Sequence, residues 1–256
     1  MKVLVTGATG NTGRHVVSGL RDAGVDVRVL VRDPAKAPEG TEAVVGDITD
    51  PAEAAEGVDA VYFVWPFYSA EGIDKAVKPF KDKKIAYVSS AAAEEGGFWG
   101  DVEEAVRNVT GDWTFLRITG LATNTLGWVG QAKTGKVRAP YGQAKRSLVH
   151  EKDVADMAIK AFTEDHARQI YLVTGPEALS QADQVRIIGE ALGTPAKWEE
   201  QPIEEAITQL GEEFAKSALP YWASLVDDPE PVSLDVAKVT GHPARSFDDW
   251  ARERFS

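Results

Sequence analysis

A strand, a glycine-rich turn and a helix follow one another at the start of this chain. Residues 3–14 read Val-Leu-Val-Thr-Gly-Ala-Thr-Gly-Asn-Thr-Gly-Arg, and a helical pattern continues to about Asp22. Gly7 permits a tight turn, Gly10 leaves room for a phosphate, and Gly13 lets the helix pack against the strand. The free N–H groups at the start of such a helix attract an anion. The G-x-x-G-x-x-G spacing between strand and helix predicts a dinucleotide site, with a ligand-free turn as the alternative.

Short apolar runs alternate with amphipathic stretches through the first half. The later runs, which predict further strands, lie at residues 27–31, 43–45, 60–64, 85–89, 113–118 and 169–174. Strands that alternate with helices predict an α/β fold, a Rossmann-like doubly wound parallel sheet. We expect an NAD(P)-binding domain over residues 1–175, with a pocket-forming insertion at about 120–150. A smaller, mostly helical substrate-side lobe is expected over residues 176–256.

Composition excludes several classes of function. Lys and Arg number 28 against 40 Asp and Glu, a net charge of −12, which argues against a nucleic-acid partner. The chain has no cysteine and only scattered histidines, so we expect no disulfide, no cysteine nucleophile and no protein-bound metal. No apolar run reaches the roughly 18 residues of a membrane span. With no basic leader before the first strand, we expect a cytoplasmic protein; the sequence does not predict its oligomeric state.

The residue after the second strand bears on the choice of dinucleotide. An acidic residue at this point would bind the ribose 2′-hydroxyl of NAD, but Arg32 stands here and Lys36 follows it. A guanidinium can hold a 2′-phosphate through two hydrogen bonds. The side chain of the adjacent Asp33 should point elsewhere. The sequence therefore predicts NADP(H) in preference to NAD(H), unless Arg32 is only a solvated strand end.

The segment from Thr6 to Gly13 resembles the opening of the atypical short-chain dehydrogenases/reductases. More narrowly, it is similar to the NmrA-like group, which includes NADPH-dependent quinone reductases. Residues 31–36, 45–48, 58–61, 114–117, 153–155 and 239–243 match as well, so the resemblance covers nearly the whole chain. It implies adenine contacts at Asp47 and Ile48, and ribose and nicotinamide contacts beyond the fourth strand. The expected cofactor-binding set is Gly7, Thr9, Gly10, Asn11, Thr12, Gly13, Arg32, Lys36, Asp47, Ile48, Val64, Trp65, Pro66 and Ser89.

Tyr141 and Lys145 match the Y-x-x-x-K pattern of active short-chain dehydrogenases. In that pair the tyrosine donates a proton and the lysine lowers its pKa, which requires both on one helix face. In the family the pair lies on the helix after the fifth strand, where residues 95–104 offer neither residue type. Tyr141 stands between Pro140 and Gly142, both poor helix formers. We therefore expect Tyr141 in a loop or pocket wall, not as the acid.

Serine and aromatic side chains follow the predicted strands. Ser89 and Ser90 end the fifth strand, where the family places a serine near the substrate carbonyl; ordinary turn chemistry is the alternative. Ser90 is the candidate catalytic residue. Aromatic rings at the carboxyl ends of the strands would form a flat, apolar pocket, although they could instead join the two lobes. The substrate-binding candidates are Phe67, Phe98, Trp99, Trp128, Tyr141 and Trp222.

These features predict an NADPH-dependent oxidoreductase that transfers hydride to a quinone-like or aromatic carbonyl compound without a Tyr–Lys acid pair. Its expected partner is a small planar or aromatic substrate. One alternative is a catalytically inactive protein that senses NADP(H) and regulates another protein. The other is a non-redox isomerase or cyclase on the same scaffold.

Overall fold

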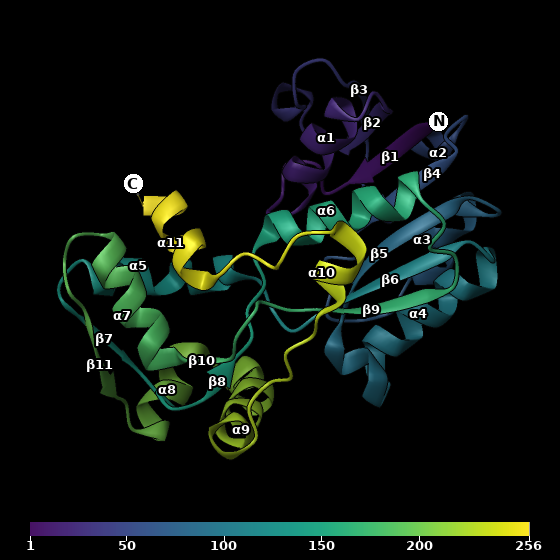
Figure 1. The fold of residues 1–256 in the computed structure, drawn as a ribbon. Helices are drawn as coiled ribbons and strands as arrows, with labels where there is room; N and C mark the ends of the chain where they lie inside the picture. The colour runs from purple at the N-terminus through teal and green to yellow at the C-terminus, as the bar shows by residue number, and fades with distance from the viewer. Residues whose placement is uncertain (256) are drawn as a thin grey trace. The chain divides into compact units, whose positions relative to one another are not determined.

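A seven-stranded parallel sheet forms the centre of the first part of the molecule (Figure 1). The computed structural model describes residues 1–255. The strand order β3-β2-β1-β4-β5-β6-β9 reverses between β1 and β4, as in a doubly wound sheet. The predicted fold class is therefore confirmed. The strands are β1 Lys2–Thr6, β2 Asp26–Val31, β3 Glu42–Val45, β4 Ala60–Phe63, β5 Lys84–Ser90, β6 Trp113–Ile118 and β9 Gln169–Val173.

Helices cover both faces of this sheet. Helices α1 (Gly13–Asp22) and α6 (Glu151–Thr163) pack together on one face, and α10 (Asp235–Thr240) packs against α6. The other face carries α2 (Ala52–Ala55), α3 (Ile73–Val77) and α4 (Gly97–Val109). Short 3-10 turns lie at η1 Pro34–Lys36, η2 Lys78–Phe80, η3 Ala91–Glu95 and η4 Ala122–Trp128. Within residues 1–255, no helix is long and apolar enough to cross a membrane.

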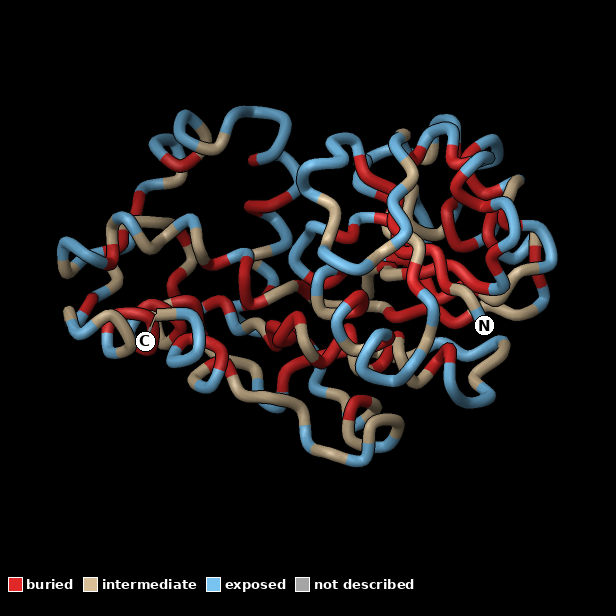
Figure 2. The backbone as a smooth tube through the Cα atoms, turned by 90° about the horizontal axis from the view of Figure 1, so that it is seen from above, coloured by how far each residue is buried: buried red, intermediate tan, exposed pale blue. Residues whose placement is uncertain are grey.

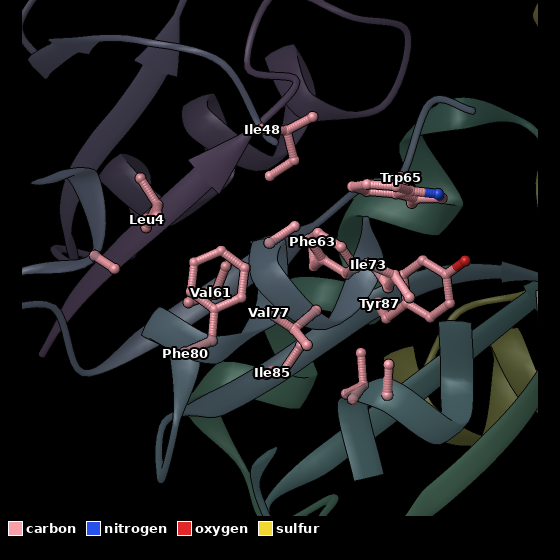
Figure 3. Close-up of a cluster of buried hydrophobic side chains, with 14 of the residues drawn as sticks. Leu4, Ile48, Val61, Phe63, Trp65, Ile73, Val77, Phe80, Ile85 and Tyr87 are labelled. Carbon is pink, nitrogen blue, oxygen red and sulfur yellow. The ribbon is translucent and has the colours of Figure 1, made fainter. Parts of the chain in front are cut away.

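Apolar side chains between the sheet and α3 and α4 form a continuous core (Figure 3). Phe63, the last residue of β4, lies 5.3 Å from Tyr87 and 6.3 Å from Trp65 between ring centroids. Phe80 meets the ring of Phe63 edge-on at 5.7 Å. Full burial of one such side chain stabilises the fold by about 1.5–3 kcal/mol. This packing fixes the end of β4, the strand beyond which the site begins.

Buried, intermediate and exposed segments follow one another along the chain, as the colours of Figure 2 show, and the strands of the sheet differ in burial. Central strand β4 is buried at every residue, as expected for a strand covered on both faces. Edge strand β3 is mostly exposed, and Val45 at its end is 56% exposed. Pairing with β2 on one side only leaves β3 with one open edge.

Residues 119–150, 174–234 and those from Pro243 to the end of the described chain form a second compact unit. Two small sheets hold it together: β7 pairs with β11 in parallel, and β8 pairs with β10 in antiparallel fashion. Their strands are β7 Lys136–Ala139, β8 Lys145–Arg146, β10 Leu179–Ser180 and β11 Lys197–Glu200. The helices are α5 Val129–Ala132, α7 Gln181–Ala191, α8 Ile203–Leu210, α9 Glu212–Asp227 and α11 Phe247–Phe255.

The boundaries of the two units differ from the expected 1–175 and 176–256. Residues 119–150, expected as an insertion in the first domain, fold with the second unit because β7 and β8 find their partners there. Residues 235–242 return to the first unit, where α10 packs against α6 and β9. Strand pairing between distant segments decides both differences.

Candidate functional site

The turn between β1 and α1 is closed by its own glycines. Gly7 has a φ of +65°, a backbone conformation that favours glycine. The N–H of Gly10 donates to the carbonyl oxygen of Gly7 at 2.8 Å. A Cβ atom on Gly13 would lie 2.2 Å from that same oxygen, so no larger residue fits there. The loop thus brings the start of α1 back against the end of β1.

The first turn of α1 carries no acidic side chain. The positive end of the helix dipole is therefore not neutralised from within the helix. Because this end adjoins the glycine loop, the loop offers an environment that favours a phosphate.

Thr6 ties the end of β1 to the end of β4. Its Oγ1 donates to the carbonyl oxygen of Tyr62 at 3.1 Å and accepts from the N–H of Val64 at 2.9 Å. These two hydrogen bonds join the ends of β1 and β4 through one side chain. They also hold the backbone of Val64, the residue that follows β4. The strand order reverses between these two strands, which is where open α/β sheets bind their ligands.

A cavity of about 560 Å³ opens at this point. Its size falls within the range of roughly 300–1,000 Å³ for small-molecule and cofactor sites. All of its lining residues belong to the first unit. They are Thr6, Gly7, Thr9, Leu30, Val31, Arg32, Asp33, Lys36, Gly46, Asp47, Ile48, Val64, Pro66 and Phe67.

The charged residues that line the cavity follow strands β2 and β3 in the chain. Arg32 and Lys36 are exposed, and neither forms an ion pair with any residue in 1–255. The carboxylate of Asp33 accepts the N–H of Ala35 at 3.0 Å and so caps the η1 turn. Asp33 itself also lines the cavity, so the expectation that its side chain points elsewhere holds only for the oxygen that Ala35 binds. Arg32 and Lys36 are the two cations that line the cavity and can meet an anion there.

Asp47 follows β3 and faces the same cavity. Its Oδ1 accepts the N–H of Thr49 at 3.0 Å and the hydroxyl of Thr49 at 2.9 Å. These hydrogen bonds, with a smaller contribution from the charge of Arg32, lower the pKa of Asp47. Its carboxylate is thus fixed as an ionised acceptor at neutral pH.

The structure brings most of the expected cofactor residues to this cavity. Those that line it are Gly7, Thr9, Arg32, Lys36, Asp47, Ile48, Val64 and Pro66, together with the substrate candidate Phe67. Gly10, Asn11, Thr12 and Gly13 belong to the glycine loop without lining the cavity. Sequence reasoning did not include Thr6, Leu30, Val31 and Gly46, whose positions at strand ends are the signal that could have found them.

The polar groups of Trp65 and Ser89 form hydrogen bonds with residues that do not line the cavity. Trp65 is 2% exposed, and its Nε1 donates to the carbonyl of Ser69 at 2.7 Å. Ser89 is buried and donates from Oγ to Glu103 at 2.7 Å. Neither lines the cavity, in contrast to the expectation. The Oγ of Ser90 is half-buried and accepts the N–H of Ala92 at 3.2 Å, which leaves its own proton to be donated.

Glu103 on α4 is the centre of a buried ion cluster. It accepts two hydrogen bonds from Arg117, at 2.9 and 2.8 Å, and one from Arg107 at 3.0 Å. Burial acts to raise the pKa of Glu103, but the hydrogen bonds from Arg117 and Ser89 outweigh it, so the net shift is downward. The cluster holds α4 against the carboxyl ends of β5 and β6.

Aromatic rings follow β4 and β5 within the first unit. Phe67 meets Trp65 edge-on at 4.8 Å, Tyr68 meets Phe98 at 6.2 Å, and Phe98 lies 4.5 Å from Trp99. Phe67 is 41% exposed and Tyr68 is 85% exposed, so part of this apolar surface is open. The expected aromatic groups at these strand ends are therefore present beside the cavity-lining residue Phe67.

The other aromatic candidates belong to the second unit. Trp128 meets Trp198 edge-on at 5.5 Å. Tyr141 and Trp222 pack against the buried cluster of α8 and α9. Tyr141 lies outside any helix, with a φ of +59°, and Lys145 begins β8 with its side chain exposed. The two residues therefore do not share a helix face.

One cluster of possible metal ligands was not expected from the sequence. Side-chain atoms of Asp153, Asp156 and His242 lie within 4.8 Å of one another, and His242 pairs with Asp156 at 3.2 Å. Acidic groups beside a histidine also form ion pairs without a metal, so the cluster carries no assignment.

Comparison with known proteins gives a consistent family. A family model described as NAD(P)H-binding matches residues 7–165. The chain is 35% identical to a (4-alkanoyl-5-oxo-2,5-dihydrofuran-3-yl)methyl phosphate reductase of Streptomyces griseus, over 98% of this chain and 97% of that protein. It is 32% identical to an NAD(P)H azoreductase of Xenophilus azovorans, over 98% and 96% respectively.

Solved structures share the fold. Triphenylmethane reductase of a Citrobacter species, complexed with NADP(H), superposes with a TM-score of 0.82 at 23% identity, over 99% of this chain and all 100% of that one. An NADPH-dependent quinone oxidoreductase from Escherichia coli gives a TM-score of 0.79 at 22% identity, with coverage of 99% and 100%.

Proposed function

This chain belongs to the NAD(P)H-binding family, and we propose that it is an NADPH-dependent reductase of quinone-like or aromatic carbonyl compounds. The observation that carries the proposal is the cavity between β1 and β4, which joins the glycine loop to two unpaired cations. Two relatives that match nearly the whole chain are named as reductases. Different residues support the proposed cofactor and the proposed hydride acceptor.

Arg32 and Lys36 support NADP(H) in preference to NAD(H). Both line the cavity without an ion pair among residues 1–255, while one carboxylate oxygen of Asp33, the adjacent acid, accepts the N–H of Ala35. A 2′-phosphate would neutralise the two cations and accept hydrogen bonds from the guanidinium. NAD(H) offers only a hydroxyl at this place. Asp47 and Ile48 are proposed to contact the adenine side.

The open aromatic surface after β4 and β5 supports a planar acceptor. Phe67 contributes to the cavity, and Phe98 and Trp99 continue the apolar surface within the same unit. Flat rings bury large areas against other rings. The relatives are named for azo compounds and for a conjugated furanone phosphate, which are also unsaturated acceptors.

Bound NADPH supplies the hydride, and the chain supplies binding and orientation. The glycine loop and the start of α1 bind the pyrophosphate, and Arg32 holds the 2′-phosphate. Helix α4 contains neither tyrosine nor lysine, so no Tyr–Lys acid stands at the family position. Ser90 is proposed to donate a hydrogen bond from its free Oγ–H to the substrate carbonyl. Quinones need little help from an acid, whereas simple ketones need more.

Cofactor consumption tests this proposal. We expect the purified protein to oxidise NADPH with quinones, more slowly with aromatic ketones, and to prefer NADPH over NADH. The missing acid on α4 also fits a protein that senses NADP(H) without turnover. Such a protein would bind NADPH tightly and leave it unconsumed with every acceptor, and this result would replace the reductase with the sensor.

A further inference from the structure

A buried tyrosine lies directly beneath the glycine loop. Tyr62 on β4 is fully buried, and its hydroxyl donates to Oγ1 of Thr12 at 2.7 Å. Its backbone carbonyl accepts a second hydrogen bond, from Thr6 at the end of β1. One residue of β4 therefore contacts both ends of the loop that joins β1 to α1.

Thr12 occupies the N-cap position of α1 without capping it. A threonine at this position ordinarily accepts a hydrogen bond from an N–H of the first helical turn, but Thr12 makes no such side-chain bond. Its oxygen accepts the proton of Tyr62 instead. Burial raises the pKa of Tyr62, so its hydroxyl keeps the proton that it donates to Thr12.

The proton of the Thr12 hydroxyl is left without an acceptor. Within residues 1–255 this hydroxyl donates to no protein group, and Thr12 is 7% exposed. A hydroxyl that accepts from below, from Tyr62, has its own proton directed away from that bond. This leaves the hydroxyl proton of Thr12, itself a residue of the glycine loop, available to a ligand bound at the loop.

We propose that Tyr62 is a positioning residue for the cofactor pyrophosphate, acting through Thr12, whose hydroxyl it orients to donate to a phosphate oxygen. This inference rests on the proposed binding of NADPH at the glycine loop. It assigns a role in cofactor affinity to a side chain that lines no part of the cavity. A hydrogen bond to a charged group contributes more than a neutral one, which makes the effect measurable.

Tyr87 provides a matched control. It lies on the adjacent strand β5, where it pairs in register with Phe63, the residue after Tyr62. It is as fully buried as Tyr62, but its hydroxyl has no hydrogen-bond partner among residues 1–255. Figure 3 shows its ring among the core side chains around Phe63. Tyr87→Phe removes the same atom as Tyr62→Phe without removing a hydrogen bond.

The experiment compares two ligands by titration calorimetry. NADPH contains the pyrophosphate, whereas adenosine 2′-monophosphate carries only the adenosine and the 2′-phosphate. Tyr62→Phe should weaken NADPH binding and raise its KM by roughly tenfold, the equivalent of about 1.4 kcal/mol. Binding of adenosine 2′-monophosphate and kcat should change by less than about threefold, since the hydride step does not involve Thr12. Tyr87→Phe should leave both affinities unchanged.

Substitutions at Thr12 test the same hydrogen bond from its other side. Thr12→Val should lose about as much NADPH affinity as Tyr62→Phe, and Thr12→Ser should keep most of it. The double variant Tyr62→Phe/Thr12→Val should lose no more than either single variant, because both remove one interaction. These variants keep the inference testable if Tyr62→Phe does not fold.

Two results would overturn the inference. One is unchanged NADPH affinity in both Tyr62→Phe and Thr12→Val. The other is an equal loss for NADPH and adenosine 2′-monophosphate, which would show a general structural role. Failure of the reductase proposal is separate, because it appears as NADPH that wild-type protein binds but does not consume.

Discussion

At the scale of single residues, the choice of cofactor depends on Arg32. Its guanidinium lines the cavity, forms no ion pair within residues 1–255, and follows β2 where an NAD-binding chain would carry an acid. Loss of a charged, two-point contact costs about 1.5–3 kcal/mol. Arg32→Ala should therefore weaken NADPH binding roughly ten- to a hundredfold. NADH affinity should hardly change.

A fluorescence titration with both cofactors checks this prediction. Lys36→Ala serves as a comparison, and we expect a smaller loss because lysine contacts a phosphate as a point charge. Equal losses of NADPH and NADH in Arg32→Ala would show that this side chain does not read the 2′-phosphate.

Substitutions at two glycines of the loop are expected to affect different properties: one the stability of the fold, the other the binding of NADPH. A Cβ on Gly13 would lie 2.2 Å from the carbonyl oxygen of Gly7, whereas a Cβ on Gly10 would lie 3.1 Å from it, at an exposed position. Gly13→Ala should therefore destabilise the fold by roughly 3 kcal/mol. Gly10→Val should stay folded by circular dichroism and lose NADPH binding. Near-normal NADPH affinity in Gly10→Val would place the dinucleotide elsewhere.

At the scale of elements, the cluster around Glu103 joins α4 to β5 and β6. Glu103 is 1% exposed and holds Arg117, which is 15% exposed. Removal of one partner from a buried pair leaves a charge without compensation, so Glu103→Gln should destabilise the fold by about 3 kcal/mol. Glu104→Gln, exposed on the same helix, is the control and should change stability by less than about 0.5 kcal/mol. Urea denaturation measures both.

The same cluster predicts a pH dependence. The folded-state pKa of Glu103 lies below its ordinary value of 4.5, so the cluster stabilises the fold fully above that pH. The contribution is lost as pH falls through the lower folded-state pKa. The stability difference between wild type and Glu103→Gln should be constant near neutrality and shrink below about pH 4.5. A difference that is independent of pH down to acid unfolding would show that the carboxylate charge contributes nothing.

Helix α9 contains a proline, a residue that argues against a helix in the sequence. Its interior Pro220 costs about 3 kcal/mol of helix propensity, and no helix was predicted at this position within the mostly helical lobe expected over residues 176–256. Tertiary packing of Ala215 and Leu219 against α8 compensates for that cost. Pro220 is exposed, so Pro220→Ala should raise stability by about 1–3 kcal/mol, read as a higher Tm. Ser224→Ala on the same helix is the control, and a Tm no higher than that of the control would contradict this explanation.

At the scale of the whole molecule, local patterns predicted the first unit better than the second. The seven strands of the parallel sheet were expected from apolar runs, because both faces of such a sheet are covered and the signal lies within each run. The pairings of β7 with β11 and of β8 with β10 join distant segments. Such pairings leave no periodic pattern in the local sequence. The expected domain boundary between residues 175 and 176 therefore differs from the boundaries of the two compact units.

The same contrast between local and distant sequence signals applies to the residues of the candidate site. The loop glycines, Arg32 and Asp47 could be placed from spacing and family resemblance because they stand at strand ends of a regular sheet. The direction of a side chain could not: Ser89 was expected at the cofactor, and its hydroxyl instead donates to Glu103, whose position depends on how α4 packs. The support of Thr12 by Tyr62 was hidden for the same reason, because residues 50 positions apart meet only in the fold.

The most direct test of the account is kcat/KM for NADPH and for NADH with one quinone, measured in parallel on wild type and Arg32→Ala. Wild type should consume NADPH with a clear preference over NADH. In Arg32→Ala this preference should fall by roughly tenfold or more while turnover with NADH is retained. No consumption of either cofactor, or a preference that Arg32→Ala leaves unchanged, would contradict it.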